Sequence, residues 1–237
     1  MSGKDSPRSA DKNRILAAFS AGNGKHIIQK LQPIVLVDKQ VLYEQGDSIK
    51  YVYFPVSAVV SLVSAMEDGF SIEVATTGHE GFVGIGVYLG IGKAFTKAIV
   101  QAPGEAFRIQ ADLFMAELEK TGSFHALLHR YTHALLMQIS RSGGCNSLHS
   151  VEQRCARWLL AMHDRSKTDE LPLTQEFLGE MLGVRRPSVS VVAAKLQKAG
   201  LIRYNRGKVK ICDRPGLEKA SCECYRILKE EYDSLLD

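Results

Sequence analysis

Residues 173–202 read LTQEFLGEMLGVRRPSVSVVAAKLQKAGLI, and this stretch decides the fold of the C-terminal part of the chain. Thr174 is a favourable N-cap for a first helix, and Gly183 a favourable residue to end it. Pro187 is tolerated in a helix only in the first turn, so a second helix is predicted to begin near Arg186. Apolar residues recur at helical spacing and predict the buried faces of the two helices: Phe177, Leu178, Met181 and Leu182, then Val189, Val192, Ala193 and Leu196. Two helices joined by a tight turn predict a helix-turn-helix, whose second helix enters the major groove of DNA.

The predicted second helix would meet DNA with its N-terminal end first. We expect the side chains there to contact base edges, because guanidinium and hydroxyl groups at this end of a recognition helix reach atoms such as guanine O6 and N7. The base-reading candidates are Arg185, Arg186, Ser188 and Ser190. Lys195 and Lys198 lie further along and are expected to meet phosphates or solvent. Thr174 and Gln175, at the start of the first helix, are expected to contact the DNA backbone.

The next residues, RYNRGKVKI at 203–211, predict two short strands joined at Asn205–Gly207, which would form a basic wing. Arg203, Arg206, Lys208 and Lys210 would bring positive charge to phosphates. Residues 174–211 hold eight basic and two acidic residues, a net charge of +6, while the whole chain carries +4, so the remainder carries −2. This concentration favours a nucleic acid partner over the alternative of an ordinary solvated surface.

The N-terminal half predicts a small antiparallel sandwich or roll, preceded by a helix around residues 13–19. Residues 34–47 and 51–78 are rich in Val, Ile, Tyr and Phe between turn residues, which is typical of short strands. Asp68-Gly69 predicts a hairpin with a type I′ turn, which needs positive φ at both residues. Residues 97–109 predict a further strand pair, with Pro103-Gly104 as its turn.

From about Ser123 the apolar period becomes helical and predicts a long helix over residues 123–148. A narrow face carries its apolar and small residues: Phe124, Leu128, Tyr131, Leu135, Ile139 and Ser142. The seven-residue spacing within this stripe predicts a dimer interface between two such helices, with burial against the protein's own β domain as the alternative. Ser150 and Gln153 then have capping-box spacing and predict that another helix, carrying Trp158, begins here.

The composition, 45% hydrophobic and 24% charged residues in a chain of 237, is ordinary for a globular protein. An odd number of cysteines, five, at irregular spacing favours a reducing compartment, and with no apolar leader or bilayer-length run we expect a cytoplasmic location without membrane contact. Recognisable enzyme motifs are missing, so we expect no catalysis.

Cofactor and metal sites are not predicted. Cys222 and Cys224 would point apart on a helix, so ordinary packing is favoured over a metal or thiol switch. His125, His129 and His133 share a helix face, which favours a polar flank over a metal or pH-sensing role.

With these motifs the chain resembles the Crp/Fnr family of bacterial transcription regulators. The resemblance is carried by residues 42–54, LYEQGDSIKYVYF, by the helix-turn-helix at 173–202, and by RGKVKI at 206–211. It implies an α+β fold with a cyclic-nucleotide-binding-like antiparallel β-roll, a long dimerisation helix and a C-terminal winged helix-turn-helix. The implied parts are an N-terminal arm and short helix at 1–20, the roll at 21–122, the long helix at 123–148 and the DNA-binding domain at 149–237.

The family resemblance also implies partners: double-stranded DNA with a two-fold symmetric site, a second copy of the chain and RNA polymerase. An alternative function is a small-molecule-binding regulatory module whose C-terminal helices contact a protein. Arg186 matches a base-reading arginine of the family, but Pro187 and Val191 stand where other members carry glutamate and a second arginine. We therefore expect a different target sequence.

The β-roll departs from the members that bind cyclic AMP, which are expected to carry a Gly-Glu pair for the ribose and an Arg-Ser pair for the phosphate. Phe82 stands where the glutamate would be, and Ala94-Phe95 lie near the Arg-Ser positions. A buried phosphate would lack its charge partner, so cyclic AMP is not expected to bind. The candidate residues for an effector pocket, if an effector exists, are Phe82, Val83, Gly84, Phe95 and Thr96. No cysteine precedes Cys145, which excludes the N-terminal iron–sulfur cluster of the oxygen-sensing branch.

Overall fold

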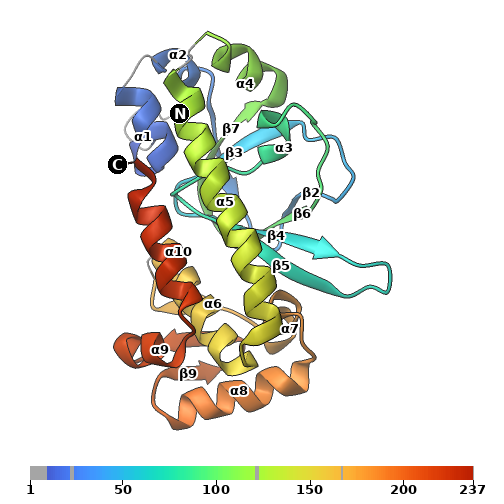
Figure 1. Ribbon diagram of the computed structural model, residues 1–237, viewed down its shortest axis with the longest axis vertical. Helices are drawn as coiled ribbons and strands as arrows, with labels where there is room; N and C mark the ends of the chain where they lie inside the picture. Colours follow the sequence, from blue (N-terminus) through green and yellow to red (C-terminus); the bar gives the residue numbers. More distant parts are fainter. Residues whose placement is uncertain (1–9, 22–23, 121–122, 167, 237) are drawn as a thin grey trace, which may run out of the picture.

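The computed structural model describes residues 10–21, 24–120, 123–166 and 168–236. A long helix runs along much of the molecule, with a β-roll beside its upper part and a helical domain around and below its lower end (Figure 1). The helices are η1 (Ala10–Lys12), α1 (Arg14–Ala21), α2 (Lys25–Ile28), α3 (Ile85–Tyr88), α4 (Ala111–Leu118), α5 (Ser123–Leu148), α6 (Val151–Ser166), α7 (Gln175–Leu182), α8 (Arg186–Lys198), α9 (Arg214–Ala220), α10 (Cys224–Asp233) and η2 (Ser234–Leu236). None of the helices in the described ranges is long and apolar enough to span a bilayer.

The β-roll consists of two antiparallel sheets with strand orders β1-β7-β3 and β2-β6-β4-β5. The predicted α+β fold, with an antiparallel roll before a long helix and a winged helix-turn-helix, is confirmed. The strands of the roll are β1 (Gln32–Leu36), β2 (Val41–Tyr43), β3 (Tyr51–Pro55), β4 (Val59–Ala65), β5 (Ser71–Thr77), β6 (Lys97–Ala102) and β7 (Gly104–Gln110).

The predicted hairpin at Asp68-Gly69 joins β4 to β5, but its turn type differs from the prediction. The amide of Met66 donates to the carbonyl of Phe70 at 2.8 Å, and the amide of Gly69 donates to the carbonyl of Met66 at 3.0 Å. Gly69 has a φ of +85°, whereas Asp68 does not have a positive φ. The type I′ assignment is therefore wrong. The loop has three residues with glycine in the left-handed position, which is another common hairpin connection.

Strands β6 and β7 form as predicted, but they do not pair with each other. Strand β6 pairs with β2 and β4, whereas β7 pairs with β1 and β3 in the other sheet. At the crossing, a Cβ on Gly104 would lie 2.5 Å from the backbone nitrogen of Ala58, so only glycine fits this close approach. The prediction of a hairpin at Pro103-Gly104 is wrong, because a local turn signal does not reveal which distant strand completes a sheet.

Helix α5 begins and ends where the sequence predicts, but its apolar stripe contacts the chain's own β-roll. Phe124, Leu128, Tyr131 and Leu135 belong to the core of the β-roll, and Ile139 packs against that core. Ser142 is also buried in the single chain. For Phe124, Leu128, Tyr131 and Leu135 the alternative, burial against the β domain, therefore holds, and the predicted dimer interface through these four residues is wrong. Helical period identifies which face of a helix is buried, but it does not identify the partner.

The predicted capping box is confirmed at the start of α6. The Ser150 amide donates to Gln153 Oε1 at 3.1 Å, and the Gln153 amide donates to Ser150 Oγ at 3.3 Å. Helix α6 then buries Trp158 in a second core, which it shares with α7, α8 and the wing.

The two hydrophobic cores do not coincide with the predicted domain boundaries. Val59, Val63 and Ala102 of the β-roll belong to the second core, while Tyr232 and Leu235 near the C-terminus belong to the first. Helix α10 packs beside α5 (Figure 1). The division of the chain at residues 20, 122 and 148 stays a prediction.

Candidate nucleic-acid interface

Helices α7 and α8 form the predicted helix-turn-helix at the lower end of the molecule (Figure 1). Thr174 Oγ1 accepts a hydrogen bond from the amide of Phe177 at 3.2 Å, which makes Thr174 the N-cap of α7. Gly183 ends α7 in the left-handed conformation, with a φ of +62°. Arg185 is the extended N-cap residue of α8, and Pro187 lies in the first turn. The helix boundaries expected from the sequence are confirmed.

The turn between α7 and α8 packs closely against the β-roll, and this approach is possible because Gly183 has no side chain. A Cβ at Gly183 would lie 2.6 Å from Ile72 Cδ1 on β5. The helix-turn-helix therefore contacts the β4–β5 hairpin directly.

A groove of about 510 Å³ separates the two helices from the wing. Five of the predicted DNA-contacting residues line it: Thr174, Gln175, Arg186, Ser190 and Arg206. Ser190 Oγ donates to Gln175 Oε1 at 2.6 Å, so these two polar side chains are held against each other. The structure thus brings residues from α7, α8 and the wing to one polar groove.

The other predicted base-reading residues lie outside this groove, on the surface of α8. Arg185 and Ser188 are exposed, and Ser188, Val191, Lys195 and Lys198 follow one another at helical spacing on an exposed face. Lys195 Nζ lies 3.4 Å from Glu152 Oε2, an exposed ion pair that water and salt weaken. Helix α8 therefore presents a solvent-facing surface next to the groove.

The predicted wing is confirmed as two antiparallel strands, β9 (Ile202–Asn205) and β10 (Lys208–Ile211). Its turn has positive φ at two consecutive residues, 46° at Arg206 and 76° at Gly207. A third strand, β8 (Glu170–Pro172), pairs with β10 and was not predicted, since three residues carry little periodic signal.

The basic residues of the wing differ in their surroundings. Lys208 Nζ donates to Glu170 Oε1 at 2.8 Å, and this hydrogen bond, with the charge of Glu170, raises the pKa of Lys208. Arg203 and Arg206 are exposed and face solvent. We therefore expect the two arginines to be more available to phosphates than Lys208.

The sequence did not predict Gln197, Tyr204 or Asn205 as DNA contacts, although all three line the groove. Gln197 Oε1 accepts from the amide of Tyr204 at 2.7 Å and so fixes the wing to α8. Burial raises the pKa of Tyr204 to about 12, which keeps its hydroxyl protonated, and it donates to the carbonyl of Leu173 at 2.8 Å. The spacing of Arg186, Ser190 and Gln197 on α8 was the signal that could have identified Gln197.

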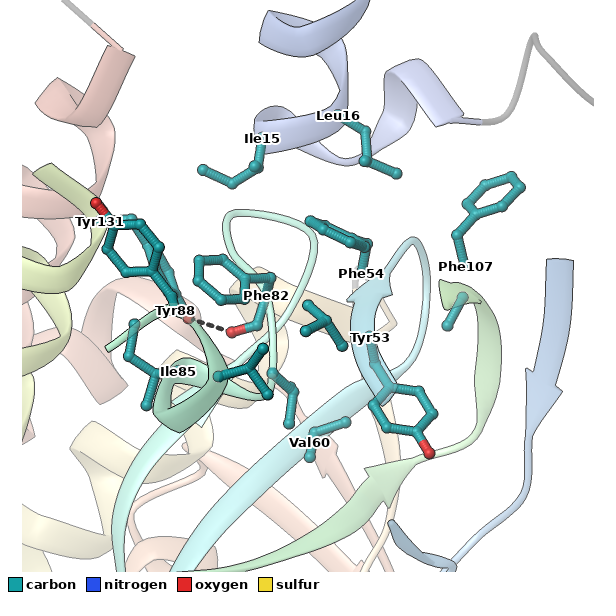
Figure 2. Close-up of a cluster of buried hydrophobic side chains, with 14 of the residues drawn as sticks. Ile15, Leu16, Tyr53, Phe54, Val60, Phe82, Ile85, Tyr88, Phe107 and Tyr131 are labelled. Atoms are coloured by element: carbon teal, nitrogen blue, oxygen red, sulfur yellow. Dashed lines mark hydrogen bonds between the residues drawn. The ribbon is translucent and has the colours of Figure 1, made fainter. Parts of the chain in front are cut away.

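The effector-pocket candidates in the β-roll differ in their exposure to solvent. The ring of Phe82 is buried, and its centroid lies 4.9 Å from that of Tyr131 and 5.9 Å from that of Phe54. Figure 2 shows Phe82 between these two rings, with Tyr131 Oη donating to the Phe82 carbonyl at 2.8 Å. Phe95, by contrast, is 49% exposed.

The remaining effector candidates have structural roles. Val83 pairs with Tyr53 through backbone hydrogen bonds of 2.8 and 2.9 Å. Gly84 precedes α3 with a φ of 112°, and Thr96 is buried. Phe82 is buried whereas Phe95 is half-exposed, and the grouping of the five candidates as one effector pocket stays a prediction.

The three histidines of α5 have different neighbours, and the two C-terminal cysteines do not lie on one helix. His133 Nδ1 lies 2.9 Å from Glu231 Oε1, while the rings of His125 and His129 lie near Tyr88, each about 6 Å away between centroids. Cys222 precedes α10, whereas Cys224 is its first residue. The premise that the two cysteines lie on one helix and diverge is therefore wrong.

Two family models match the chain. One is described as a Crp-like helix-turn-helix domain and matches residues 153–220, and the other is described as a cyclic nucleotide-binding domain and matches residues 34–121. No curated protein sequence matches significantly.

Solved structures resemble the whole arrangement. FixK2 from Bradyrhizobium japonicum is 15% identical with a TM-score of 0.65, and the match covers 81% of this chain and 98% of that one. CLP from Xanthomonas campestris, described as a c-di-GMP responsive global regulator, is 17% identical with a TM-score of 0.65, covering 81% and 99%. A Crp/Fnr family transcriptional regulator from Thermus thermophilus is 18% identical with a TM-score of 0.61, covering 80% and 98%. These likenesses show a common fold.

Proposed function

The chain belongs to the Crp/Fnr family of transcription regulators, and from this premise we propose that it acts as a homodimer on a two-fold symmetric DNA site. The observation that carries the proposal is the exposed N-terminal end of α8, with Arg185 and Arg186, beside a wing that carries Arg203 and Arg206. An exposed helix end of this kind fits the major groove, and a basic wing fits the adjacent phosphates.

Base reading is assigned to the first turns of α8. Arg186 borders the groove and has an exposed side chain that can reach guanine O6 and N7, while Arg185 and Ser188 lie beside it. Ser190 is held by Gln175, so it orients the groove and contributes to base contacts only if this hydrogen bond is exchanged. Lys195, Arg203 and Arg206 supply phosphate contacts.

The dimer is assigned to an exposed face of α5 beside the buried stripe. The exposed positions His129, His133, Leu136, Ser140 and Gly143 alternate at spacings of four and three, which is the seam of a two-helix coiled coil. Leu136 is 58% exposed, and a Cβ on Gly143 would meet nothing within 4 Å. A second copy would cover Leu136, and the small residues after it would let the backbones approach closely.

The β-roll is proposed to regulate without binding cyclic AMP. Phe82 fills the space beside Tyr131 with an aromatic ring, and its surroundings are apolar. The ribose of a cyclic nucleotide would have to displace this packing, and Ala94-Phe95, near the expected Arg-Ser positions, would leave its phosphate without a charge partner. Calorimetric titration with cyclic AMP is expected to give no saturable heat, and tight binding would contradict this part of the proposal.

The alternative, a regulatory module whose C-terminal helices contact a protein, does not account for the clustering of basic residues around the groove. Selection of bound duplexes from a random pool distinguishes the two functions. We expect an inverted repeat with half-sites about one helical turn, roughly 10 base pairs, apart. Recovery of no enriched sequence, with no duplex binding even at low salt, would contradict the proposed function.

A further inference from the structure

Four side chains that are far apart in the sequence meet at the lower end of α5. They are Cys145, His149, Cys222 and Cys224, and their sulfur and ring nitrogen atoms all lie within 4.8 Å of one another. Cys145 Sγ lies 3.5 Å from Cys222 Sγ, and Cys224 Sγ lies 3.8 Å from His149 Nδ1. The three cysteines are 1%, 3% and 3% exposed and form a small core of their own.

These donors have the chemistry and spacing of a structural zinc site. Zinc bound by cysteine thiolates and histidine is tetrahedral with Zn–S bonds of about 2.3 Å, so the sulfurs of such a site are separated by about 3.8 Å. The sulfur separation here is already close to that value. We propose that Cys145, His149, Cys222 and Cys224 bind one zinc ion. Binding would release the three thiol protons, with no change in oxidation state.

The surroundings of His149 support this assignment. Its Nδ1 faces the sulfurs, while its Nε2 lies 3.3 Å from Glu223 Oε2. A neutral imidazole can therefore bind the ion through Nδ1 and donate its Nε2 hydrogen to a carboxylate, which is the usual arrangement of a metal-bound histidine. Glu223 lies between the two C-terminal cysteine ligands in the sequence, so one short segment supplies two ligands and orients a third.

Nearby positive charge also suits the site. Three thiolates and one divalent ion leave a net charge of −1, which is costly to bury without compensation. Arg154 and Arg157 on α6 are buried and interact electrostatically with Cys145. Arg154 is held in place by hydrogen bonds to Asn146 Oδ1 and to the carbonyl of Leu182.

Local structure explains how the ligands converge. Cys145 lies in the last turn of α5, and His149 directly follows the helix with its amide donating to the Cys145 carbonyl at 3.1 Å, so the two side chains lie on one side of the helix end. Cys222 lies in the segment between α9 and α10, and Cys224 begins α10. The site therefore ties the junction of α5 and α6 to the junction of α9 and α10, and a bound ion would restrict the movement of the winged helix relative to the long helix.

Metal content tests the proposal on the full-length protein purified under reducing conditions and incubated with zinc chloride. We expect about one tightly bound zinc per chain, and at least a tenfold loss of zinc affinity in Cys222→Ser, since one of four ligands is removed. Cys212→Ser is the matched control, because Cys212 is exposed and outside the cluster, and it should bind zinc like the wild type. Glu223→Gln should weaken zinc binding by about tenfold, the lower end expected for a supporting carboxylate.

A second experiment uses the wild-type protein, so its result does not depend on whether a variant folds. Alkylation followed by peptide mass spectrometry should show Cys145, Cys222 and Cys224 protected by zinc and reactive after chelation, whereas Cys212 should react in both states. Replacement of zinc by cobalt should give the intense sulfur-to-metal absorption of a tetrahedral thiolate site. Zinc-independent alkylation of the three cysteines would overturn the proposal. A second result would also overturn it. If Cys145 and Cys222 form a disulfide and the reduced protein binds no zinc, the two cysteines are a redox-active thiol pair and not metal ligands. All these readouts are independent of DNA binding.

Discussion

Arg165 of α6 donates a hydrogen bond from Nε to Oε1 of Glu80, in the loop after β5, at 2.7 Å. The two side chains are 11% and 7% exposed, so this ion pair joins the DNA-binding part of the chain to the β-roll in a desolvated setting. The amide of Gly78 also donates to Glu80 Oε1, at 3.1 Å. Burial alone raises the pKa of Glu80, but the charge of Arg165 and the backbone hydrogen bonds outweigh it and lower the pKa below its ordinary value.

Glu80→Gln is expected to reduce the free energy of unfolding at neutral pH by about 3 kcal/mol, because the Arg165 charge stays buried without its partner. Denaturant titration measures this difference. Since the folded pKa is lowered, the stabilisation from Glu80 is present above the pKa of an unfolded carboxyl, about 4.3. It is lost as the pH falls through the folded value, so the difference between wild type and variant should shrink in acid.

Glu73 provides a matched control, since it is a second buried glutamate with the opposite shift. Ser61 Oγ donates to Glu73 Oε2 at 2.6 Å, but burial dominates and raises the pKa of Glu73. Its stabilising contribution is therefore present below the unfolded pKa and lost as the pH rises through the folded pKa. Glu73→Gln should leave the stability at neutral pH unchanged or increase it. Equal losses in the two variants would show that the Arg165 pair has no special role.

Local signals predicted the parts of this fold that depend on neighbouring residues. The helix-turn-helix was predictable because Thr174, Gly183 and Pro187 define its helix ends within a few residues. The partners of β6 and of the apolar face of α5 were not predictable, since a strand or stripe does not encode which distant segment covers it. The cysteine and histidine cluster was missed for the same reason, because 77 residues separate Cys145 from Cys222.

Gly183→Ala is expected to destabilise the protein by about 3 kcal/mol, because it combines a positive φ with overlap against Ile72. Gly200→Ala isolates the first effect: Gly200 has a φ of +76°, and a Cβ there would meet nothing within 4 Å. The free energy of unfolding of Gly200→Ala should therefore fall by only about 1 kcal/mol. Adding Ile72→Ala to Gly183→Ala should recover part of the excess. Thermal unfolding of the three variants measures these differences, and equal losses for the two glycine variants would remove Ile72 from the explanation.

Arg186→Ala and Arg206→Ala should affect DNA binding in different ways. Loss of Arg186 is expected to relax base preference at one position of each half-site, at a cost of about 1–3 kcal/mol. Loss of Arg206 should weaken binding to all sequences, and the slope of log affinity against log salt should fall by about 0.9 for each phosphate contact removed. Arg226→Ala, on α10 and outside both the groove and the wing, is the control for charge alone. Unchanged selectivity in Arg186→Ala would remove Arg186 from base reading.

Leu136→Glu should convert the proposed dimer to a folded monomer. Leu136 is 58% exposed on α5, so the substitution should leave both hydrophobic cores intact. In a dimer, however, the seam would bring two carboxylates together and desolvate them, which should raise the dimer dissociation constant by more than tenfold, or about 1.4 kcal/mol.

Sedimentation equilibrium measures that constant, and circular dichroism checks that the fold is retained. Leu113→Glu is the matched control, since Leu113 is a 40% exposed leucine on α4, away from the proposed seam. It should remain as dimeric as the wild type. A dimer of undiminished affinity in Leu136→Glu would place the contact elsewhere than on this face of α5, because two buried carboxylates at one seam position cannot be accommodated without a large energetic cost.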